Sequence, residues 1–242
     1  MVRHTQLFIL TLILLLAAAA RLTDIDAQSL WVDEGFTYFT TKQTNLLPIL
    51  SIDVHPPLYF LLMNGWARLT GNSELALRYL SFLPGMLSIA VVYQIGSELV
   101  RQRGRNPDLS WIPVIGALLL ALADIELDLA KEARMYTLHT LFAALSILAY
   151  LRWWRQPRPA YGLLLAVSSA ALVYTNYLGV WTPLLIGLHV LLFLRGRQRI
   201  IAFGILSAAA LLVLPWLLLV GVNQLGNGTG AERADASSFA TL

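Results

Sequence analysis

Two adjacent acids, Asp33 and Glu34 in the stretch SLWVDEGFTYFT, are of the residue type needed for acid–base chemistry. Taken alone, such a pair is more often a solvated loop feature than a site. Here it is flanked by aromatic residues that favour a membrane interface and would partly dry the acids, namely Trp31, Phe36, Tyr38 and Phe39. Desolvation raises the pKa of a carboxylate and makes it a better general base. The pair is therefore a candidate catalytic site.

Other polar residues would suit an anionic lipid substrate. Arg78 would contact its phosphate, and Arg134, next to Met135-Tyr136, is a second candidate ligand. As a lone residue, Arg78 is better explained by a side chain that reaches the lipid headgroups. His55 precedes two prolines and either begins a helix or acts on substrate. The segment ADIELDLAKEAR, which holds Glu132, has no metal-ligand spacing, so no cofactor is predicted and a divalent metal stays open.

The composition shows which elements must position these residues. Of the 242 residues, 57% are hydrophobic and only 13% are charged, against about 25% charged residues in soluble domains. The apolar residues form long runs, which predicts an all-α polytopic membrane protein. The chain has no cysteine, so disulfides, thiol nucleophiles and cysteine-bound metals are excluded.

Seven apolar runs predict about seven transmembrane helices: Leu7–Ala20, Leu75–Ile95, Trp111–Ala123, Tyr136–Leu151, Tyr161–Tyr174, Leu178–Leu194 and Ile200–Val222. The stretch 58–70 is also apolar but would extend only about 20 Å, against a hydrocarbon core of about 30 Å. Its polar residues Asn64, Arg68 and Gly71 would form one stripe. We therefore expect a juxtamembrane helix lying in the interface.

The arginines test this assignment independently. If 58–70 does not span and the N-terminus is cytoplasmic, ten of the 17 basic residues lie inside, namely Arg3 and nine arginines in the short connections around residues 101–105, 152–158 and 195–199. This is the positive-inside pattern, and the clusters are explained by topology and membrane lipid contact rather than by nucleic acid. The candidate site residues then share the outer face of a plasma (inner) membrane.

Two parts of the chain have further interpretations. The first run follows MVRHTQ and also resembles a secretory signal, although the loop behind it favours a retained anchor. Residues 1–222 are expected to form the transmembrane domain, with juxtamembrane helices in the outer loop 21–74. Residues 223–242 form a Gly/Ser/Ala-rich outer segment that resembles an interrupted loop.

An ordered set of motifs resembles the family 39-like membrane glycosyltransferases. The set is the Asp-Glu pair, DVHPPLYFLL, an arginine in ALRYLSFLPG, EARMY and YTNYLG, over roughly residues 5 to 220. This group has the GT-C fold and includes protein O-mannosyltransferases, lipid A aminoarabinose transferases and the bacterial RgtA/B/C/D-like domain type. The resemblance covers an N-terminal part, since relatives are typically about twice this length. The chain is thus expected to be truncated or a fragment.

The resemblance implies a polyprenyl-phosphate sugar donor and a lipid, glycan or protein acceptor, as in the synthesis of cell-envelope glycans such as lipopolysaccharide. It makes Asp33 the base and Glu34 its neighbour. It implies substrate-binding roles for His55, Arg78, Glu132, Arg134 and Asn176, the last at a position where relatives often have histidine.

One base with a bound anion favours a single displacement with inversion. A retaining mechanism would want two carboxylates about 5 to 5.5 Å apart. A transporter or lipid flippase is an alternative, although it would need a polar path that the predicted spans lack. A truncated, non-catalytic membrane protein is a third hypothesis.

Overall fold

The computed structural model describes residues 2–104, 109–222 and 224, and within these residues helices are the only regular secondary structure. The predicted outer segment 223–242 lies, except for Gln224, outside the described residues. The elements in chain order are α1 (Val2–Leu22), α2 (Val32–Thr41), α3 (Leu47–Ile52), α4 (Leu58–Thr70), α5 (Glu74–Gln102), α6 (Ile112–Ala121), α7 (Asp124–Leu129), α8 (Tyr136–Arg155), α9 (Pro159–Thr175), the 3₁₀ turn η2 (Tyr177–Val180), α10 (Trp181–Phe193), α11 (Gly196–Trp216) and the π-helical turn η3 (Leu217–Gly221).

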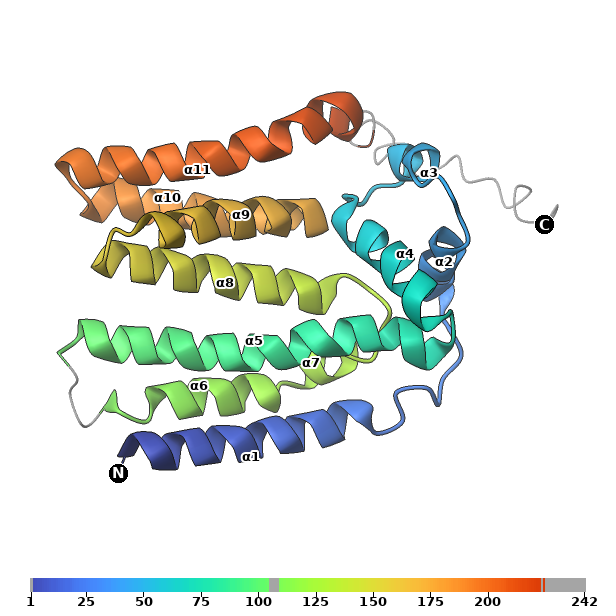
Figure 1. Cartoon of the computed structure of the whole chain (residues 1–242), viewed down its shortest axis with the longest axis horizontal. Helices are drawn as coiled ribbons and strands as arrows, with labels where there is room; N and C mark the ends of the chain where they lie inside the picture. The colour runs from blue at the N-terminus through green and yellow to red at the C-terminus, as the bar shows by residue number, and fades with distance from the viewer. Residues whose placement is uncertain (1, 105–108, 223, 225–242) are drawn as a thin grey trace.

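Each of the seven predicted apolar runs forms a helix, and these helices lie side by side in one bundle (Figure 1). Three segments among the described residues are long and apolar enough to cross a membrane, namely His4–Leu22, Glu74–Gln102 and Gly196–Gly221. The other four helices of the bundle are shorter or carry charged ends, and they pack between or beside these three. The prediction of an all-α polytopic membrane protein is confirmed.

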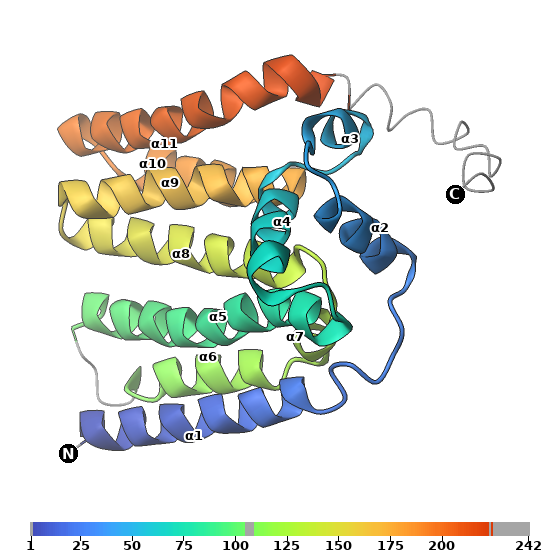
Figure 2. The same cartoon turned by 45° about the vertical axis from the view of Figure 1, so that its right-hand side comes forward.

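The two ends of the bundle differ in character. Helices α2, α3 and α4 lie together at one end, shown on the right in Figures 1 and 2. The connections α5–α6, α8–α9 and α10–α11, which carry the arginine clusters, lie at the opposite end. Arg105 falls outside the described residues. The arginine-rich end and the end with the candidate site are therefore separated by the length of the helices.

Helix α4 has the predicted bounds and lies across the end of the bundle (Figure 2). Of the predicted polar stripe, Arg68 and Gly71 are exposed as expected, but Asn64 is not. Asn64 is buried, and its Nδ2 donates to the backbone oxygens of Thr40 and Gln43 at 3.0 and 3.1 Å. The last carbonyls of a helix have no partner within that helix. Asn64 therefore satisfies the end of α2, and this inward demand explains a polar residue in an apolar helix.

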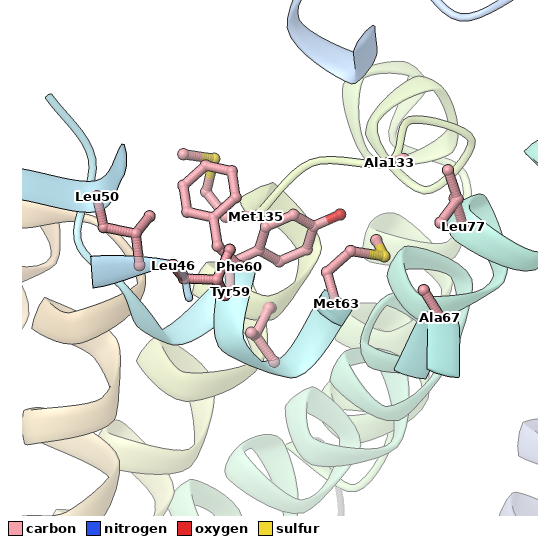
Figure 3. Packing of buried hydrophobic residues seen from close by; sticks show 10 residues of the cluster. Leu46, Leu50, Tyr59, Phe60, Met63, Ala67, Leu77, Ala133 and Met135 are labelled. Carbon is pink, nitrogen blue, oxygen red and sulfur yellow. The ribbon is translucent and has the colours of Figure 1, made fainter. Parts of the chain in front are cut away.

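A buried hydrophobic cluster fixes the end of the bundle that holds α2, α3 and α4. It joins residues of α3, α4 and α5 to the turn before α8, and Figure 3 shows their side chains, namely Leu46, Leu50, Tyr59, Phe60, Met63, Ala67, Leu77, Ala133 and Met135. The Phe60 ring meets the Phe36 ring of α2 edge-on at 5.5 Å. Apolar burial of this kind is the main favourable term in folding. This cluster therefore fixes the relative positions of the elements that carry the polar residues of the candidate site.

Helices α1, α5 and α6 are held by close contacts. At Gly96 of α5, an added Cβ would lie 2.7 Å from the Cα of Pro113, so only glycine permits this approach of α6. Arg21, at the end of α1, is fully buried and donates from Nη1 to the carbonyl of Ala121 at 3.1 Å. A cation is favourable at a helix C-terminus. Arg21 thus fastens the end of α1 to the end of α6. The first long loop begins directly after this contact, at the end of α1.

Candidate active site

Glu34 and Arg78 form a buried ion pair at the centre of the candidate site. Glu34 lies in the first turn of α2, where a negative charge suits the helix dipole. Arg78 lies in the second turn of α5, which begins after the N-cap Ser73. The pair is bidentate, with Nε to Oε1 at 2.9 Å and Nη2 to Oε2 at 2.8 Å. This geometry suits the planar guanidinium and fixes both groups in orientation.

Arg78 also holds the loop that leads into α2. Its remaining hydrogens point to backbone oxygens of Ile25, Gln28 and Ser29, at 2.8, 2.8 and 3.4 Å. A guanidinium has five N–H donors, and these contacts together with Glu34 occupy all of them. The phosphate contact expected of Arg78 from the sequence would have to displace one of these bonds.

Glu34 is equally well satisfied. Its Oε1 also accepts from the backbone N–H of Ala133 at 2.7 Å, and its Oε2 from that of Trp31 at 3.3 Å. Burial by itself would raise the pKa of Glu34, but the bonds from Arg78, Ala133 and Trp31 together hold the pKa below its usual value. Glu34 is therefore a charged structural group that joins α2, α5 and the turn before α8.

Asp33 has a different environment from its neighbour. Its side chain is 42% exposed, and Oδ2 lies 3.6 Å from Nη2 of Arg134, whose own side chain is 3% exposed. Nη1 of Arg134 donates to the backbone oxygen of Asp33 at 3.2 Å. A separation of 3.6 Å is an ion pair but too long for a hydrogen bond. The Asp33 carboxylate is thus accessible and held near a buried cation.

His55 completes a polar line with these two residues. Its Nε2 lies 3.5 Å from Nη2 of Arg134, and its Nδ1 lies 3.3 Å from Oδ2 of Asp53. Since arginine only donates, Nε2 accepts and the ring hydrogen lies on Nδ1, which donates to Asp53. The sequence left open whether His55 faces the site or only begins α4. The structure places its ring against Arg134.

One nitrogen of the Arg134 guanidinium is left without a partner within the described part of the chain. Its Nε is buried and has no hydrogen-bond partner among the described residues. The backbone of Arg134 is fixed, because its carbonyl accepts from the Ser81 hydroxyl at 3.0 Å. A buried donor without a partner is costly and calls for an explanation. A ligand anion beside Arg134 would provide one.

A polar cavity of about 690 Å³ lies on the other side of the Glu34–Arg78 pair, between the loop after α1 and the turn after α7. Glu132, Asp128, Lys131 and Trp31 contribute to its lining. Partial burial, followed by the charge of nearby Glu34, raises the pKa of Glu132 above its usual value. Glu132 therefore lies beside the central pair but does not join the line of Asp33, Arg134 and His55.

Asn176 lies at the end of α9 and caps the turn η2. Its Oδ1 accepts from the backbone N–H of Leu178 at 2.9 Å. Among the expected site residues, the structure thus brings together Asp33, Glu34, His55, Arg78 and Arg134. Glu132 lines the neighbouring cavity, and the side chain of Asn176 is engaged in its own turn.

Sequence reasoning missed two residues that hold the site. Ser81 lies three positions after Arg78, so the helical period places both on one face of α5. That spacing was a usable signal. Asp53, which orients His55, is two residues away in the sequence. Within the described part of the chain, no group of three or more His, Cys, Asp or Glu residues is arranged to hold a metal ion.

The fold and the site define a class, an all-α multi-pass membrane protein with a charged polar site at one end of its bundle. Residues 54–220 match the dolichyl-phosphate-mannose-protein mannosyltransferase family, and the chain belongs to this family. It is a membrane glycosyltransferase of the mannosyltransferase type, in agreement with the resemblance seen in the sequence. No curated protein and no solved structure matches the chain.

Proposed function

We propose that the protein transfers a sugar from a polyprenyl-phosphate donor to an acceptor hydroxyl, with Asp33 as the general base. The observation that carries this proposal is the accessible carboxylate of Asp33 beside the buried guanidinium of Arg134, whose Nε lacks a partner in the described residues. A base and an anion ligand are the two groups that this reaction needs. The family description, which names a dolichyl-phosphate-linked mannose, supports the class of donor.

The reaction balances with these two groups. The acceptor oxygen forms a bond to the anomeric carbon while its proton moves to the Asp33 carboxylate. The bond from that carbon to the phosphate oxygen breaks, and the lipid phosphate leaves with the electron pair. A phosphate is already a stable anion, so it needs charge neutralisation more than a proton. Arg134 supplies it from a buried and fixed position.

The neighbouring charges have supporting roles in this proposal. Arg78 and Glu34 fasten the loop before α2 and thereby set the position of Asp33. His55 and Asp53 hold the guanidinium of Arg134 from the other side. We therefore assign the phosphate contact to Arg134 and a positioning role to Arg78, which the sequence alone had ranked in the opposite order.

The surroundings of Glu34 favour inversion over retention. A retaining mechanism needs a second carboxylate as nucleophile. Glu34 is fully buried, and both of its oxygens accept hydrogen bonds from Arg78 and from backbone groups. It therefore lacks the free lone pair and the access that attack on a sugar requires. A single displacement, assisted by Asp33 alone, agrees with this arrangement.

We place the site on the outer face of the membrane, with the arginine-rich connections and the N-terminus on the cytoplasmic side. The separation of the two ends of the bundle supports this orientation. The cavity lined by Glu132 opens beside the central pair and is our candidate for the acceptor, which is a lipid, a glycan or a protein. Asn176 contributes by beginning η2 rather than by a direct contact.

Asp33→Asn tests this proposal. The amide keeps the size of the side chain but cannot take a proton, so transfer of mannose from dolichyl-phosphate mannose should fall about 10²- to 10⁴-fold. The protein is purified in detergent, transfer is followed with a radiolabelled donor, and thermal unfolding is recorded in parallel. We expect the melting temperature to change little, because Asp33 is partly exposed and its side chain makes no hydrogen bond to Arg134.

Asp26→Asn is the matched control, since Asp26 is an exposed acid in the loop that leads into α2. It should leave both transfer and stability unchanged. Normal turnover by Asp33→Asn would refute the assignment of the base. A wild-type protein that binds but does not turn over the donor would instead refute the transfer itself.

A further inference from the structure

A buried amide joins the last described residue of the chain to the loop that carries His55. Gln224 is 2% exposed. Its Nε2 donates to the backbone oxygens of Leu50 and His55, the second at 3.2 Å. Its Oε1 accepts from the hydroxyl of Tyr177, and that hydroxyl in turn accepts from Nε1 of Trp216 at 3.0 Å. Both ends of the amide are therefore fully used.

The direction of every hydrogen in this network is determined. An indole nitrogen only donates, so Trp216 gives its hydrogen to the Tyr177 oxygen. The Tyr177 hydrogen must then point at Gln224. Backbone carbonyls only accept, so the amide nitrogen of Gln224 faces Leu50 and His55. The opposite orientation of the amide would not satisfy its three partners, Leu50, His55 and Tyr177.

The network connects parts of the chain that are far apart in sequence. Trp216 ends α11, and Tyr177 begins η2 after α9. Gln224 follows the π-helical turn η3, a type of irregularity that often occurs at functional sites. Leu50 and His55 belong to the segment between α2 and α4, more than 165 residues earlier. Gln224 thus connects the C-terminal end of the described chain to the segment between α2 and α4.

We propose that Gln224 is a positioning residue that acts on the reaction through His55. It holds the backbone of His55 while the ring of the same residue contacts Arg134 and Asp53. His55 therefore has its main chain held by Gln224, which follows η3, and its side chain held by Arg134 and Asp53. This inference rests on the proposed function for its effect on turnover, but the anchoring of the loop is measurable without any activity.

Two variants separate the parts of the network. Gln224→Leu keeps the approximate volume but removes both donors, so the carbonyls of Leu50 and His55 lose their partner. Tyr177→Phe leaves those donors in place and removes only the hydroxyl, so its effect should be smaller. Val222→Ala, at an exposed residue of the same segment, is the matched control.

The first measurement is hydrogen exchange followed by mass spectrometry on the full-length protein in detergent. Gln224→Leu should speed exchange of the backbone amides in residues 50–55 by roughly tenfold, the size expected when anchoring hydrogen bonds are lost, while α5 and α8 stay unchanged. Val222→Ala should leave the same peptide at the wild-type rate. Unchanged exchange in Gln224→Leu would overturn the inference.

The second measurement is a double-mutant cycle with His55→Ala, using kcat and KM for dolichyl-phosphate mannose. Gln224→Leu alone should lower kcat/KM by roughly tenfold, and it should have no further effect once His55 is gone. A residue with a purely structural role would lower kcat/KM equally in both backgrounds, and that result would overturn the inference. A wild-type protein without transfer overturns the proposed function instead, and the exchange measurement then decides about Gln224 alone.

Discussion

Two adjacent acids in this protein, each paired with an arginine, illustrate a closed and an open ion pair. Glu34 and Arg78 are both buried, are joined by two hydrogen bonds, and have every other donor and acceptor engaged by the backbone. Asp33 and Arg134 are also close, but their charged groups are 3.6 Å apart and the acid is partly exposed. Each pair joins α2 to another part of the bundle end.

The difference shows how a role follows from unused bonding capacity rather than from charge. The closed pair has no free donor, so a substrate gains nothing from it unless the loop moves. The open pair keeps one donor of Arg134 unsatisfied and one carboxylate in reach of substrate. Burying charge carries a high desolvation cost in either case. In the closed pair this desolvation cost is offset by hydrogen bonds within the protein. In the open pair we expect a bound ligand to offset it.

The largest effect should come from breaking the closed pair with Arg78→Met. The change leaves Glu34 buried without its partner and frees the carbonyls of Ile25 and Gln28. Removing one member of a buried pair costs about 3 to 5 kcal/mol. We therefore expect a large loss of stability, measured by thermal unfolding in detergent, and loss of transfer as a consequence of unfolding.

Arg68→Met is the control, because Arg68 is an exposed arginine in nearby α4. It should change stability by no more than about 0.5 kcal/mol. If Arg78→Met unfolds at the same temperature as Arg68→Met, the pair is not the structural link that we describe.

The sequence predicted most of the fold because the fold follows from apolar length. All seven expected helices are present, and the 13-residue α4 lies at the end of the bundle. The same length argument would have excluded α6, which has only ten helical residues yet runs beside α1 and α5. Length alone does not separate a short helix that is expected to span, such as α6, from a helix at the end of the bundle such as α4. The arginine-rich connections separate them, because they fall on one side of the membrane only if 58–70 does not span.

The sequence predicted which residues form the candidate site, but not which arginine pairs with which acid. The motif order pointed to Asp33, Glu34, Arg78 and Arg134, yet it could not show which arginine keeps a free donor. That outcome depends on the backbone of residues 25–29, which turns toward Arg78 only in the folded chain. Asn64 is a similar case. Its position in an apolar helix looked like an interfacial stripe, whereas its amide is needed by the end of α2.

Arg134→Gln tests the open pair and should have the next largest effect. Glutamine can still donate a hydrogen bond toward Asp33 or His55 but has no charge to stabilise a leaving phosphate. Removing one donor that stabilises a developing charge lowers kcat about 10²- to 10³-fold in other enzymes. We expect a fall of that size in mannose transfer. The change in unfolding temperature should be much smaller than for Arg78→Met.

Arg134→Lys provides the matched comparison, since it keeps the charge but loses the planar group. It should recover part of the lost kcat. Equal activity of Arg134→Gln and the wild-type protein would show that the free donor of Arg134 serves no substrate, and the contrast between the two pairs would disappear.

The smallest effect should come from Glu132, which lines the same cavity as Glu34 but has its pKa shifted in the opposite direction. Hydrogen bonds hold the pKa of Glu34 below its usual value, against the effect of burial, so Glu34 stabilises the fold at neutral pH and this contribution is lost as the pH falls. Partial burial and the charge of Glu34 raise the pKa of Glu132. In the folded state Glu132 therefore holds its proton to a higher pH than in the unfolded chain. Its charge costs stability at neutral pH, and this cost disappears in acid.

Glu132→Gln should accordingly stabilise the protein near pH 7, by less than about 1 kcal/mol because the group is partly exposed. The gain should shrink as the pH falls through the ordinary pKa of glutamate, about 4.3, because Glu132 then becomes protonated in both states. Glu34→Gln should show the opposite dependence, with a large loss at pH 7 that shrinks as the pH falls. Thermal unfolding of both variants and the wild-type protein from pH 3 to 8 measures this, because the contribution of Glu34 falls only below the ordinary pKa of glutamate, about 4.3. If both variants follow the same pH dependence, the two acids do not differ in the way that the hydrogen bonds of Glu34 and the partial burial of Glu132 require.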